Sequence, residues 1–387
     1  MRRFKSHLPH DFLYKYNSLK IKIESDKMDV ERRFDLIKRS PTEEIITEED
    51  LRKLLETKQR PVAYDGFEPS GILHLGSGIL RAIKINDLLE AKVDFILWIA
   101  DWFAYINNKM GGNLELIKKV GEYFVEGWKA CGIDTKKIKI MWTSDAVKDE
   151  NYWKGVIDVA KNSTVQRAAR ASPIMGRSEA DMKYVSQLVY PMMQAWDPFY
   201  FGADILQLGM DQRHATILSR ELAAKLGQSP RVCVHHHLLA GLQGSKGRMG
   251  QETATLQIED KMSKSKPHTA IFIHDTTKEI VEKINNAFCP EKIIEGNPVI
   301  EIWKYIILRK FDSRIIKRPA KFGGDLEIQS YEELEKIFRE GKLHPMDLKK
   351  ETAEAVDEIL EPVRKHFDKN KKAAELYQIV KNARVTR

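Results

Sequence analysis

The chain has 387 residues, of which 42% are apolar and 31% charged, a composition typical of globular proteins that excludes a disordered or fibrous chain. Lys and Arg number 64 against 56 Asp and Glu, and the net charge of +8 suits a nucleic-acid partner without establishing one. No apolar run approaches the roughly 18 residues that a membrane span needs, and the N-terminus lacks the apolar core of a signal peptide. We therefore expect a cytoplasmic protein without membrane contact, in which Cys131, Cys233 and Cys289 are buried thiols.

Residues 1–45 precede the first strong pattern and are predicted to form a basic N-terminal extension. Residues 1–27 carry a net charge of +4, and a helical pattern runs from Met28 to Lys38. The sequence does not indicate what this extension does.

The next segment predicts one βαβ unit of a parallel sheet. Leu51, Leu54 and Leu55 share a helical face, and Pro61 ends that helix. Residues 61–66 then predict a short strand, residues 66–76 a loop rich in turn formers, residues 79–88 a helix, and residues 95–100 a continuous apolar strand. A strand, a Gly-rich loop, a helix and a second buried strand in this order are typical of parallel sheets.

The alternation continues and predicts an α/β fold with a doubly wound, Rossmann-type parallel sheet over residues 46–243. Further strands are expected at 138–142, 203–208 and 231–236, with helices at 114–131 and 212–226. Residues 147–190 are helical and interrupt the alternation, so we interpret them as a helical insertion between two halves of the sheet.

The C-terminal part predicts a separate, all-helical domain. Residues 244–275 form a loop and linker, and Thr276-x-x-Glu279 is a capping box that begins a helix. From residue 276 to residue 387 the periodicity is almost purely helical, and residues 361–387 carry a net charge of +5. The basic excess of the chain therefore lies at its two ends.

The loop Pro69-Ser70-Gly71-Ile72-Leu73-His74-Leu75-Gly76 follows the first predicted strand, where an open α/β sheet binds ligands. Glycines let a nucleotide approach the backbone, the N-terminus of the next helix favours phosphate, and His74 can donate to a phosphate oxygen. By itself the loop is equally consistent with an ordinary tight turn.

A second motif, Lys261-Met262-Ser263-Lys264-Ser265, is more specific. Two lysines separated by small hydroxyl residues can close on the β- and γ-phosphates of ATP and stabilise the charge that builds as pyrophosphate leaves. A solvated basic loop is the alternative, but it does not explain why this pattern follows the His74 loop.

The two motifs together resemble the nucleotide-binding motifs of class I aminoacyl-tRNA synthetases. Three further segments are similar to the tyrosyl-tRNA synthetase family of archaea and eukaryotes: Tyr64-Asp-Gly-Phe-Glu-Pro-Ser-Gly, Tyr190-Pro-Met-Met-Gln-Ala-Trp-Asp197 and Gly209-Met-Asp-Gln-Arg213. Residues 321–326 and 343–349 resemble that family's anticodon-binding domain, so the resemblance extends from about Leu51 to Phe367.

The resemblance implies a ligase that activates tyrosine with ATP to tyrosyl-adenylate and then transfers tyrosine to the 3′-terminal adenosine of tRNA(Tyr). The implied partners are tyrosine, ATP with Mg²⁺, tRNA(Tyr) and a second copy of the chain, which would form a homodimer through the helical insertion. No tightly bound metal or organic cofactor is expected.

The resemblance also assigns a tyrosine pocket. Tyr64 and Asp197 match the pair that hydrogen-bonds the phenolic hydroxyl, and phenylalanine would leave a buried acceptor there unpaired. The remaining positions of the pocket, including those that hold the amino end of tyrosine, are Gly66, Glu68, Tyr190, Gln194 and Gln212.

For the ATP site, the resemblance implies that Asp211 binds the ribose hydroxyls. The expected catalytic residues, which act by positioning and charge stabilisation without a general base, are His74, Lys261 and Lys264. The other expected ATP contacts are Gly71, Gly76, Ser77, Gly209, Met262, Ser263 and Ser265. Ser77 is a departure, because the first motif of the family has histidine at that position.

For tRNA, Arg213 corresponds to a residue near the first base pair of the acceptor stem. Asp347 matches the acidic residue that reads the first anticodon base, a guanine, with Phe322 and His344 nearby. Phe103 and His214 stand where many relatives have histidine and lysine.

Three alternatives remain open at the level of sequence: a tryptophanyl-tRNA synthetase, a small-molecule nucleotidyltransferase and a tRNA-binding module without catalysis. Tyr64 with Asp197 argues against the first, the region of Asp347 against the second, and the intact Lys261 and Lys264 against the third. A metal site at residues 235–237, three consecutive histidines, is not expected, because successive side chains of a strand point to opposite faces.

Overall fold

The computed structural model describes residues 29–175, 183–244, 261–263 and 267–383. Its main sheet has six strands in the order β1-β6-β5-β2-β3-β4. Five of them are parallel: β2 (Val62–Phe67), β3 (Asp94–Ile99), β4 (Ile138–Trp142), β5 (Ile205–Gly209) and β6 (Val232–His236). These five strands are confirmed within two residues of their expected bounds.

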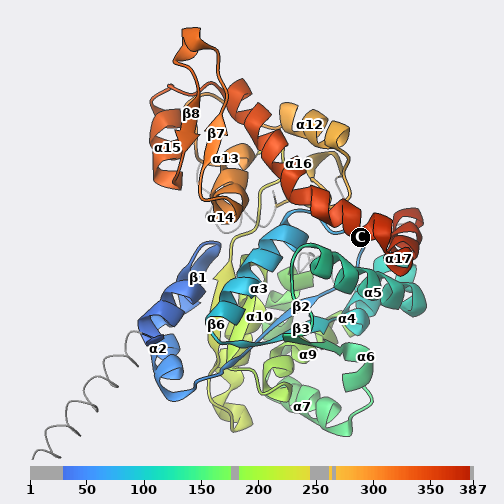
Figure 1. Cartoon of the computed structure of the whole chain (residues 1–387). Coiled ribbons are helices and arrows are strands. Elements are labelled where there is room, and N and C mark those ends of the chain that lie inside the picture. The colour runs from blue at the N-terminus through green and yellow to red at the C-terminus, as the bar shows by residue number, and fades with distance from the viewer. Residues whose placement is uncertain (1–28, 176–182, 245–260, 264–266, 384–387) are drawn as a thin grey trace, which may run out of the picture.

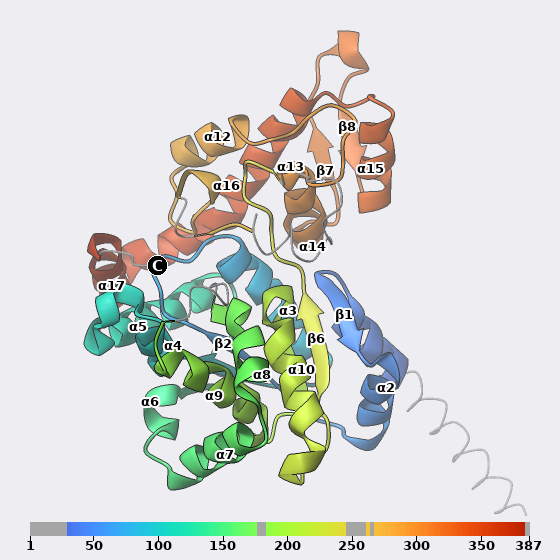
Figure 2. The ribbon, with the colours of Figure 1, turned by 180° about the vertical axis from the view of Figure 1, so that it is seen from behind.

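Helices cover both faces of this sheet, so successive residues of a strand point into different cores. In β3, Phe95 and Leu97 belong to the core under α3 (Arg81–Glu90) and α5 (Leu114–Ala130), whereas Ile96 and Trp98 belong to a second core. The second core lies under α7 (Glu150–Lys161), α9 (Ser186–Tyr200) and α10 (Arg213–Leu222), which Figure 2 shows on the face opposite to α3. The predicted doubly wound fold is therefore confirmed.

The helical insertion between β4 and β5 consists of α6 (Thr143–Ala146), α7, α8 (Val165–Arg170), the 3₁₀ turn η3 (Ser172–Met175) and α9. Helices α7 and α9 approach closely at Gly155, where an added Cβ atom would lie 1.9 Å from the Trp196 ring. Because α9 continues past residue 190, the insertion leads directly into the expected tyrosine pocket.

Residues 29–46 pack onto the sheet, which differs from the extension predicted for residues 1–45. Residues 29–38 are helical, and Phe34 and Ile37 are buried in the core shared with α2 (Glu48–Thr57) and α3. Strand β1 (Thr42–Ile46) then pairs antiparallel with β6, so the expected boundary at residue 45 falls inside a strand. Residues 1–28 lie outside the described residues.

The C-terminal region contains α12 (Thr277–Asn285), α13 (Pro298–Ile302), α14 (Leu308–Lys310), α15 (Tyr331–Arg339), α16 (Pro345–Lys369) and α17 (Lys371–Asn382). The capping box is present, since Thr276 and Glu279 each accept the other's backbone N–H. The region is not all-helical as predicted, because β7 (Arg314–Ile316) and β8 (Leu326–Ile328) pair antiparallel. Three-residue strands are too short to produce a recognisable alternation.

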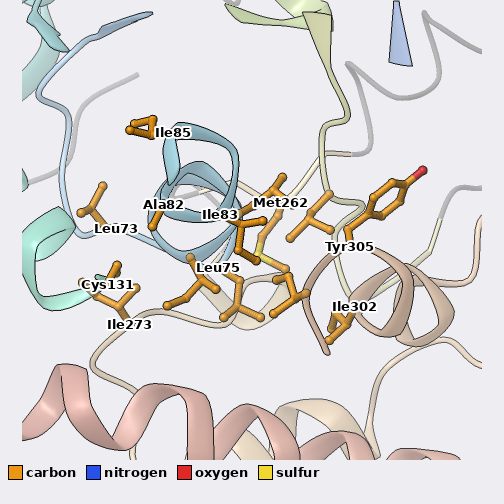
Figure 3. Packing of buried hydrophobic residues seen from close by; sticks show 14 of the residues in the cluster. Leu73, Leu75, Ala82, Ile83, Ile85, Cys131, Met262, Ile273, Ile302 and Tyr305 are labelled. Atoms are coloured by element: carbon orange, nitrogen blue, oxygen red, sulfur yellow. The ribbon is translucent and has the colours of Figure 1, made fainter. Parts of the chain in front are cut away.

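The C-terminal region and the main sheet share one apolar core. Figure 3 shows Leu75, Met262, Ile273 and Ile302 gathered around the first turn of α3. Helices α16 and α17 lie against α5 (Figure 1), and all three contribute to this core. Within the described ranges, no helix combines the length and the apolar character needed to cross a membrane.

Candidate active site

The predicted phosphate loop follows β2 and is paired with residues 271–273, which come shortly after the second motif. The Leu75 N–H donates to the Ile271 carbonyl at 2.9 Å, and the Ile273 N–H donates to the Leu73 carbonyl at 3.0 Å. His74 lies between these two hydrogen bonds in an isolated antiparallel bridge. The phosphate loop is therefore tied by main-chain hydrogen bonds to the segment that follows the second motif.

His74 and Ser77 are oriented by their own turn. The Gly76 N–H donates to His74 Nδ1 at 3.2 Å, and the His74 N–H donates to Ser77 Oγ at 3.0 Å. Ser77, the departure from the family motif, thus accepts a hydrogen bond from the loop backbone. Residues 76–80 form a π-helical turn before α3, a feature that often marks functional sites. Gly71 has a φ of +119°, which a residue with a side chain rarely adopts.

The two residues expected at the phenolic end of tyrosine lie together in the second core. Tyr64 of β2 is buried, and Asp197 of α9 is 1% exposed. Burial raises the pKa of Asp197 well above its usual value. Burial, followed by the nearby Asp197 carboxyl, also raises the pKa of Tyr64. Asp197 lies inside α9 and not at its N-terminus, so its carboxyl does not cap this helix.

Tyr152 completes this group, and the sequence analysis did not identify it. The Tyr152 hydroxyl donates to Asp197 Oδ1 at 2.8 Å from helix α7. Burial raises the pKa of Tyr152, so its hydroxyl keeps its proton. No motif surrounds Tyr152 in the sequence, and only the packing of α7 on α9 brings it to Asp197.

Polar side chains expected around the amino end of tyrosine form two hydrogen-bonded pairs. The Tyr190 hydroxyl donates to Glu68 Oε1 at 2.7 Å, and Gln194 Nε2 donates to Gln212 Oε1 at 2.9 Å. Tyr190 and Gln194 are four residues apart on α9 and so share one face of that helix. Asn107, which the sequence analysis missed, donates to Glu68 at 3.1 Å and fixes the carboxylate from a second side.

Phe103, a departure from the family pattern, packs against this pocket. It lies on α4 (Asp101–Ile106), and its ring meets Tyr190 edge-on, with centroids 4.8 Å apart and an interplanar angle of 83°. Gly66 approaches the pocket from β2, where an added Cβ atom would lie 3.1 Å from the Trp98 ring.

The predicted ribose ligand lies at the carboxyl end of β5, the edge where open α/β sheets bind ligands. Gly209 ends the strand, and Asp211 follows in the 3₁₀ turn η5 (Met210–Gln212). An added Cβ atom at Gly209 would lie 2.6 Å from Asp211 Oδ1, so a larger residue here would displace the Asp211 carboxylate. The Lys261 ammonium forms an ion pair with the Asp211 carboxylate.

Met262 anchors the start of the second motif. Its N–H donates to the Leu239 carbonyl at 2.6 Å, and its side chain is buried among residues of α3 and the C-terminal region (Figure 3). Ser263 is half-buried beside it. Lys264 and Ser265 lie outside the described residues, so the structure brings only the first part of this motif to the site.

Arg213, expected near the acceptor stem, is held by β1. Its Nε donates to Glu44 Oε2 at 2.9 Å, and His235 Nδ1 lies 2.7 Å from the same carboxylate oxygen. The hydrogen bond from His235 is the main cause that lowers the pKa of Glu44. His214 is exposed beside Arg213.

The three consecutive histidines have three different sets of partners. His235 contacts Glu44, His236 contacts Arg81, and His237 contacts Glu43 and Glu301. In the part of the chain that the structure describes, His, Cys, Asp and Glu form no group of three or more that could hold a metal ion.

A buried charge network beneath the strand ends was also missed. Arg81 forms an ion pair with Asp65, the neighbour of Tyr64, and its guanidinium donates to Gln207 of β5 at 2.9 Å. Burial lowers the pKa of Arg81 to about 9. The sequence does contain a signal for this network. Three charged residues recur every third position along α3, and all three are buried: Arg81, Lys84 and Asp87.

The residues expected at the anticodon lie in the C-terminal region, much of which Figure 1 shows above the main sheet. Phe322 is 60% exposed in the 3₁₀ turn η9 (Ala320–Phe322), with the Lys321 ammonium 4.9 Å from the centre of its ring. His344 caps the N-terminus of α16, and Asp347 lies in the first turn of that helix. The expected tRNA residues therefore form two groups, one around Arg213 and one around Asp347.

Known proteins match this chain over most of its length. A family model described as class I tRNA synthetases (W and Y) matches residues 56–361. The cytoplasmic tyrosine–tRNA ligase 1 of Arabidopsis thaliana is 43% identical over 362 residues, covering 93% of this chain and 90% of that protein. A tyrosine–tRNA ligase of Saccharolobus islandicus is 45% identical over 366 residues, covering 93% of this chain and 100% of that protein.

Solved structures match over similar lengths. The tyrosyl-tRNA synthetase of Pyrococcus horikoshii in complex with L-tyrosine has a TM-score of 0.84 and 41% identity, covering 90% of this chain and 99% of that one. The Leishmania major tyrosyl-tRNA synthetase in complex with tyrosinol has a TM-score of 0.82 and 35% identity, covering 91% of this chain and 60% of that one.

Proposed function

Because the chain belongs to the tyrosyl-tRNA synthetases, a family of class I aminoacyl-tRNA synthetases, we propose how its own residues carry out the two steps of tyrosine–tRNA ligation. In the first step the tyrosine carboxylate attacks the α-phosphate of ATP, which gives tyrosyl-adenylate and releases pyrophosphate. In the second step a hydroxyl of the 3′-terminal adenosine of tRNA(Tyr) takes the tyrosyl group.

The observation that carries the residue assignment is the buried Asp197 carboxyl beside Tyr64. Its Oδ1 accepts a hydrogen bond from Tyr152, so the group is held in one orientation within the second core. In our proposal, the phenolic hydroxyl of tyrosine takes a place in this group. Phenylalanine would leave the buried polar atoms unpaired, a cost that makes such a site selective.

The amino end of tyrosine is assigned to the two polar pairs. Glu68 supplies a carboxylate oriented by Tyr190 and Asn107, and a carboxylate attracts an ammonium group. Gln194 and Gln212 supply amide oxygens as further acceptors. The proposed tyrosine site thus has hydrogen-bond acceptors at both ends.

For ATP, we assign the phosphates to the loop of Gly71 and His74, the ribose to Asp211, and the leaving pyrophosphate to Lys261 together with Lys264. The donors lie at the N-terminal end of α3, where the helix dipole also favours an anion. The other contacts of the nucleotide are Gly76, Ser77, Gly209, Met262, Ser263 and Ser265. Phosphate oxygens suit Mg²⁺, which keeps most of its waters, so we assign the ion to the nucleotide and not to a cage of side chains.

The domain roles follow from these assignments. We assign residues 46–243, with residues 29–45 packed on them, to catalysis, residues 244–275 to the motif loop and linker, and residues 276–387 to anticodon recognition by Phe322, His344 and Asp347. Arg213 lies beside the nucleotide site and is assigned to the acceptor stem. We place the reaction in the cytoplasm, as for the relative whose name contains that word.

A homodimer is proposed through the helical insertion, where large apolar side chains are exposed. Val165 is 73% exposed and Val185 80% exposed, and Ile157 and Tyr184 are also exposed. Analytical ultracentrifugation should show a dimer for the wild-type chain and a monomer for Val165→Glu/Val185→Glu. The matched variant Ile315→Glu, exposed on β7, should remain a dimer. A dimer in the double variant would contradict the assignment of this surface.

The experiment that tests the function is amino-acid-dependent exchange of labelled pyrophosphate into ATP. Tyrosine should stimulate exchange. Phenylalanine should stimulate it with a kcat/KM lower by the factor of about 10⁴ to 10⁵ known for enzymes of this kind. Asp197→Asn should reduce the preference for tyrosine over phenylalanine at least about ten-fold, because the amide offers only one acceptor oxygen to the phenol. Asp158→Asn on α7 is the matched control. Exchange stimulated by tryptophan and not by tyrosine, or by neither, would refute the proposal.

A further inference from the structure

The Tyr123 hydroxyl connects the phosphate loop to the segment that leads into the C-terminal region. Tyr123 lies on α5 and is fully buried. Its hydroxyl accepts a hydrogen bond from the Leu73 N–H at 3.3 Å and lies 2.9 Å from His274 Nε2. Leu73 directly precedes His74, so this hydroxyl holds the main chain one residue before the imidazole assigned to ATP.

His274 is in turn held by aromatic rings of α16 and α17. Its ring stacks on Tyr377 of α17, with centroids 3.6 Å apart and planes at 15°, and it meets Phe367 of α16 edge-on at 4.4 Å. Burial lowers the pKa of His274 to about 3, so the ring is neutral near pH 7. A neutral ring can accept the Tyr123 proton at Nε2, while the Leu73 N–H can only donate to the same hydroxyl.

The loop is tightly packed at this place. The Leu73 carbonyl accepts from the Ile273 N–H, and Figure 3 shows the Leu73 side chain near Ile273 and Cys131. On α5, an added Cβ atom at Gly127 would lie 2.6 Å from Leu73 Cδ1. Leu73 thus has little free space, and the Tyr123 hydroxyl is one of the groups that fix its main chain next to His74.

We propose that Tyr123 is a positioning residue for tyrosine activation, and that α17 sets the position of the phosphate loop through Tyr377 and His274 even when no tRNA is bound. The inference rests on the proposed function, because it requires His74 to act on ATP. It gives the C-terminal region a task in the first chemical step besides tRNA recognition. Shifts of about 1 Å in a catalytic group can cost up to about 100-fold in rate.

The first test is Tyr123→Phe, measured by pyrophosphate exchange in the full-length chain without tRNA. The variant removes one hydroxyl and keeps the ring. We expect kcat to fall about 3- to 30-fold while KM for tyrosine stays within about two-fold. The tyrosine pocket is built from β2 with Glu68 just after it, α7, α9 and η5, whereas Tyr123 lies on α5. Tyr331→Phe on α15 removes one hydroxyl elsewhere in the C-terminal region and should match the wild type.

The second test moves to α17. Tyr377→Ala should lower kcat as Tyr123→Phe does, and Tyr377→Phe, which keeps the stacking ring, should restore it to within about two-fold of the wild type. The double variant Tyr123→Phe/Tyr377→Ala should have a kcat little lower than that of the more impaired single variant, because both changes interrupt the same route from Tyr377 through His274 and Tyr123 to Leu73. Independent losses that multiply would contradict this shared route.

Two outcomes overturn the inference. One is an unchanged kcat in Tyr123→Phe, and the other is a KM for tyrosine that rises as much as kcat falls, which would indicate general damage. If Tyr377→Ala does not fold, Tyr123→Phe alone decides. Failure of the proposed function itself is seen separately, because the wild-type chain would then show no tyrosine-dependent exchange.

Discussion

Lys261 and Asp211 form an ion pair that joins the start of the second motif to the turn after β5. In the proposed reaction both groups have other partners, since Asp211 accepts ribose hydroxyls and Lys261 faces the phosphates. The lysine side chain is about one-third exposed, so solvent screens the pair and its net contribution is about 0–1 kcal/mol. ATP can therefore open the pair at little cost, and the pair keeps Lys261 close to the site before ATP binds.

Lys261→Ala should lower kcat of pyrophosphate exchange about 10²-fold with a smaller change in KM for ATP. The reason is that the ammonium stabilises charge that develops mainly in the transition state. Lys154→Ala, on the exposed face of α7, is the control. A change confined to KM for ATP would show that Lys261 only binds the nucleotide.

Asp347→Ala should reduce kcat/KM for tRNA in the aminoacylation assay about ten-fold or more and leave pyrophosphate exchange nearly unchanged. The first-turn carboxylate of α16 is assigned to a guanine edge, and each lost hydrogen bond to a charged group costs about 1.5–3 kcal/mol. Asp368→Ala, exposed near the other end of α16, should affect neither assay. Equal losses in both assays would exclude the anticodon role.

Gly155→Ala should destabilise the protein although alanine favours helices. The added Cβ atom would overlap the Trp196 ring, and overpacking of this kind costs about 1–3 kcal/mol, more than the roughly 1 kcal/mol gained in helix propensity. Urea unfolding should show a lower midpoint than the wild type. Lys154→Ala, the exposed neighbour on α7, should show little change, and an unchanged midpoint in Gly155→Ala would mean that α7 and α9 separate without cost.

Stability should fall at alkaline pH because of His237. Burial opposes charge on this ring, but hydrogen bonds to Glu301 of α13 and Glu43 of β1 raise its pKa to about 9. The unfolded-state pKa is about 6.5, so the contribution is full below about pH 6.5 and is lost as pH rises towards 9. The free energy of unfolding should decrease over this window by at most about 3 kcal/mol.

Urea unfolding between pH 6 and pH 9.5 measures that loss. His237→Gln should remove the part of the decrease in unfolding free energy with pH that comes from His237. His268→Gln, which changes an exposed histidine, should keep that decrease. If the unfolding free energy of His237→Gln fell with pH as steeply as that of the wild type, His237 would not be the cause of the alkaline loss of stability.

The parallel strands could be predicted because each is a continuous apolar run. Ile96 and Trp98 enter one core while Phe95 and Leu97 enter the other. An apolar run without alternation, as in β3, therefore indicates a strand whose two faces are both covered. Strand β1 could not be recognised in this way. Its residues Glu43 and Glu44 are polar, and their histidine partners, His237 just after β6 and His235 on β6, lie more than 190 residues away.

The C-terminal hairpin was missed for a different reason. Strands β7 and β8 have three residues each, and the surrounding sequence has helical periodicity. Their pairing depends on the turn between them and on packing against α16. An alternating pattern over three residues predicts neither of these.

The sequence by itself determined the fold class, the family and the motif residues, because these depend on residue types at short spacings. Only the tertiary structure decided which side chains support them: Tyr152 at Asp197, Asn107 at Glu68, and Tyr123 at Leu73. The partners are 45, 39 and 50 residues apart, and they meet because helices packed on either face of the sheet bring them together. Residue types at short spacings do not predict contacts that tertiary packing makes between residues so far apart in the sequence.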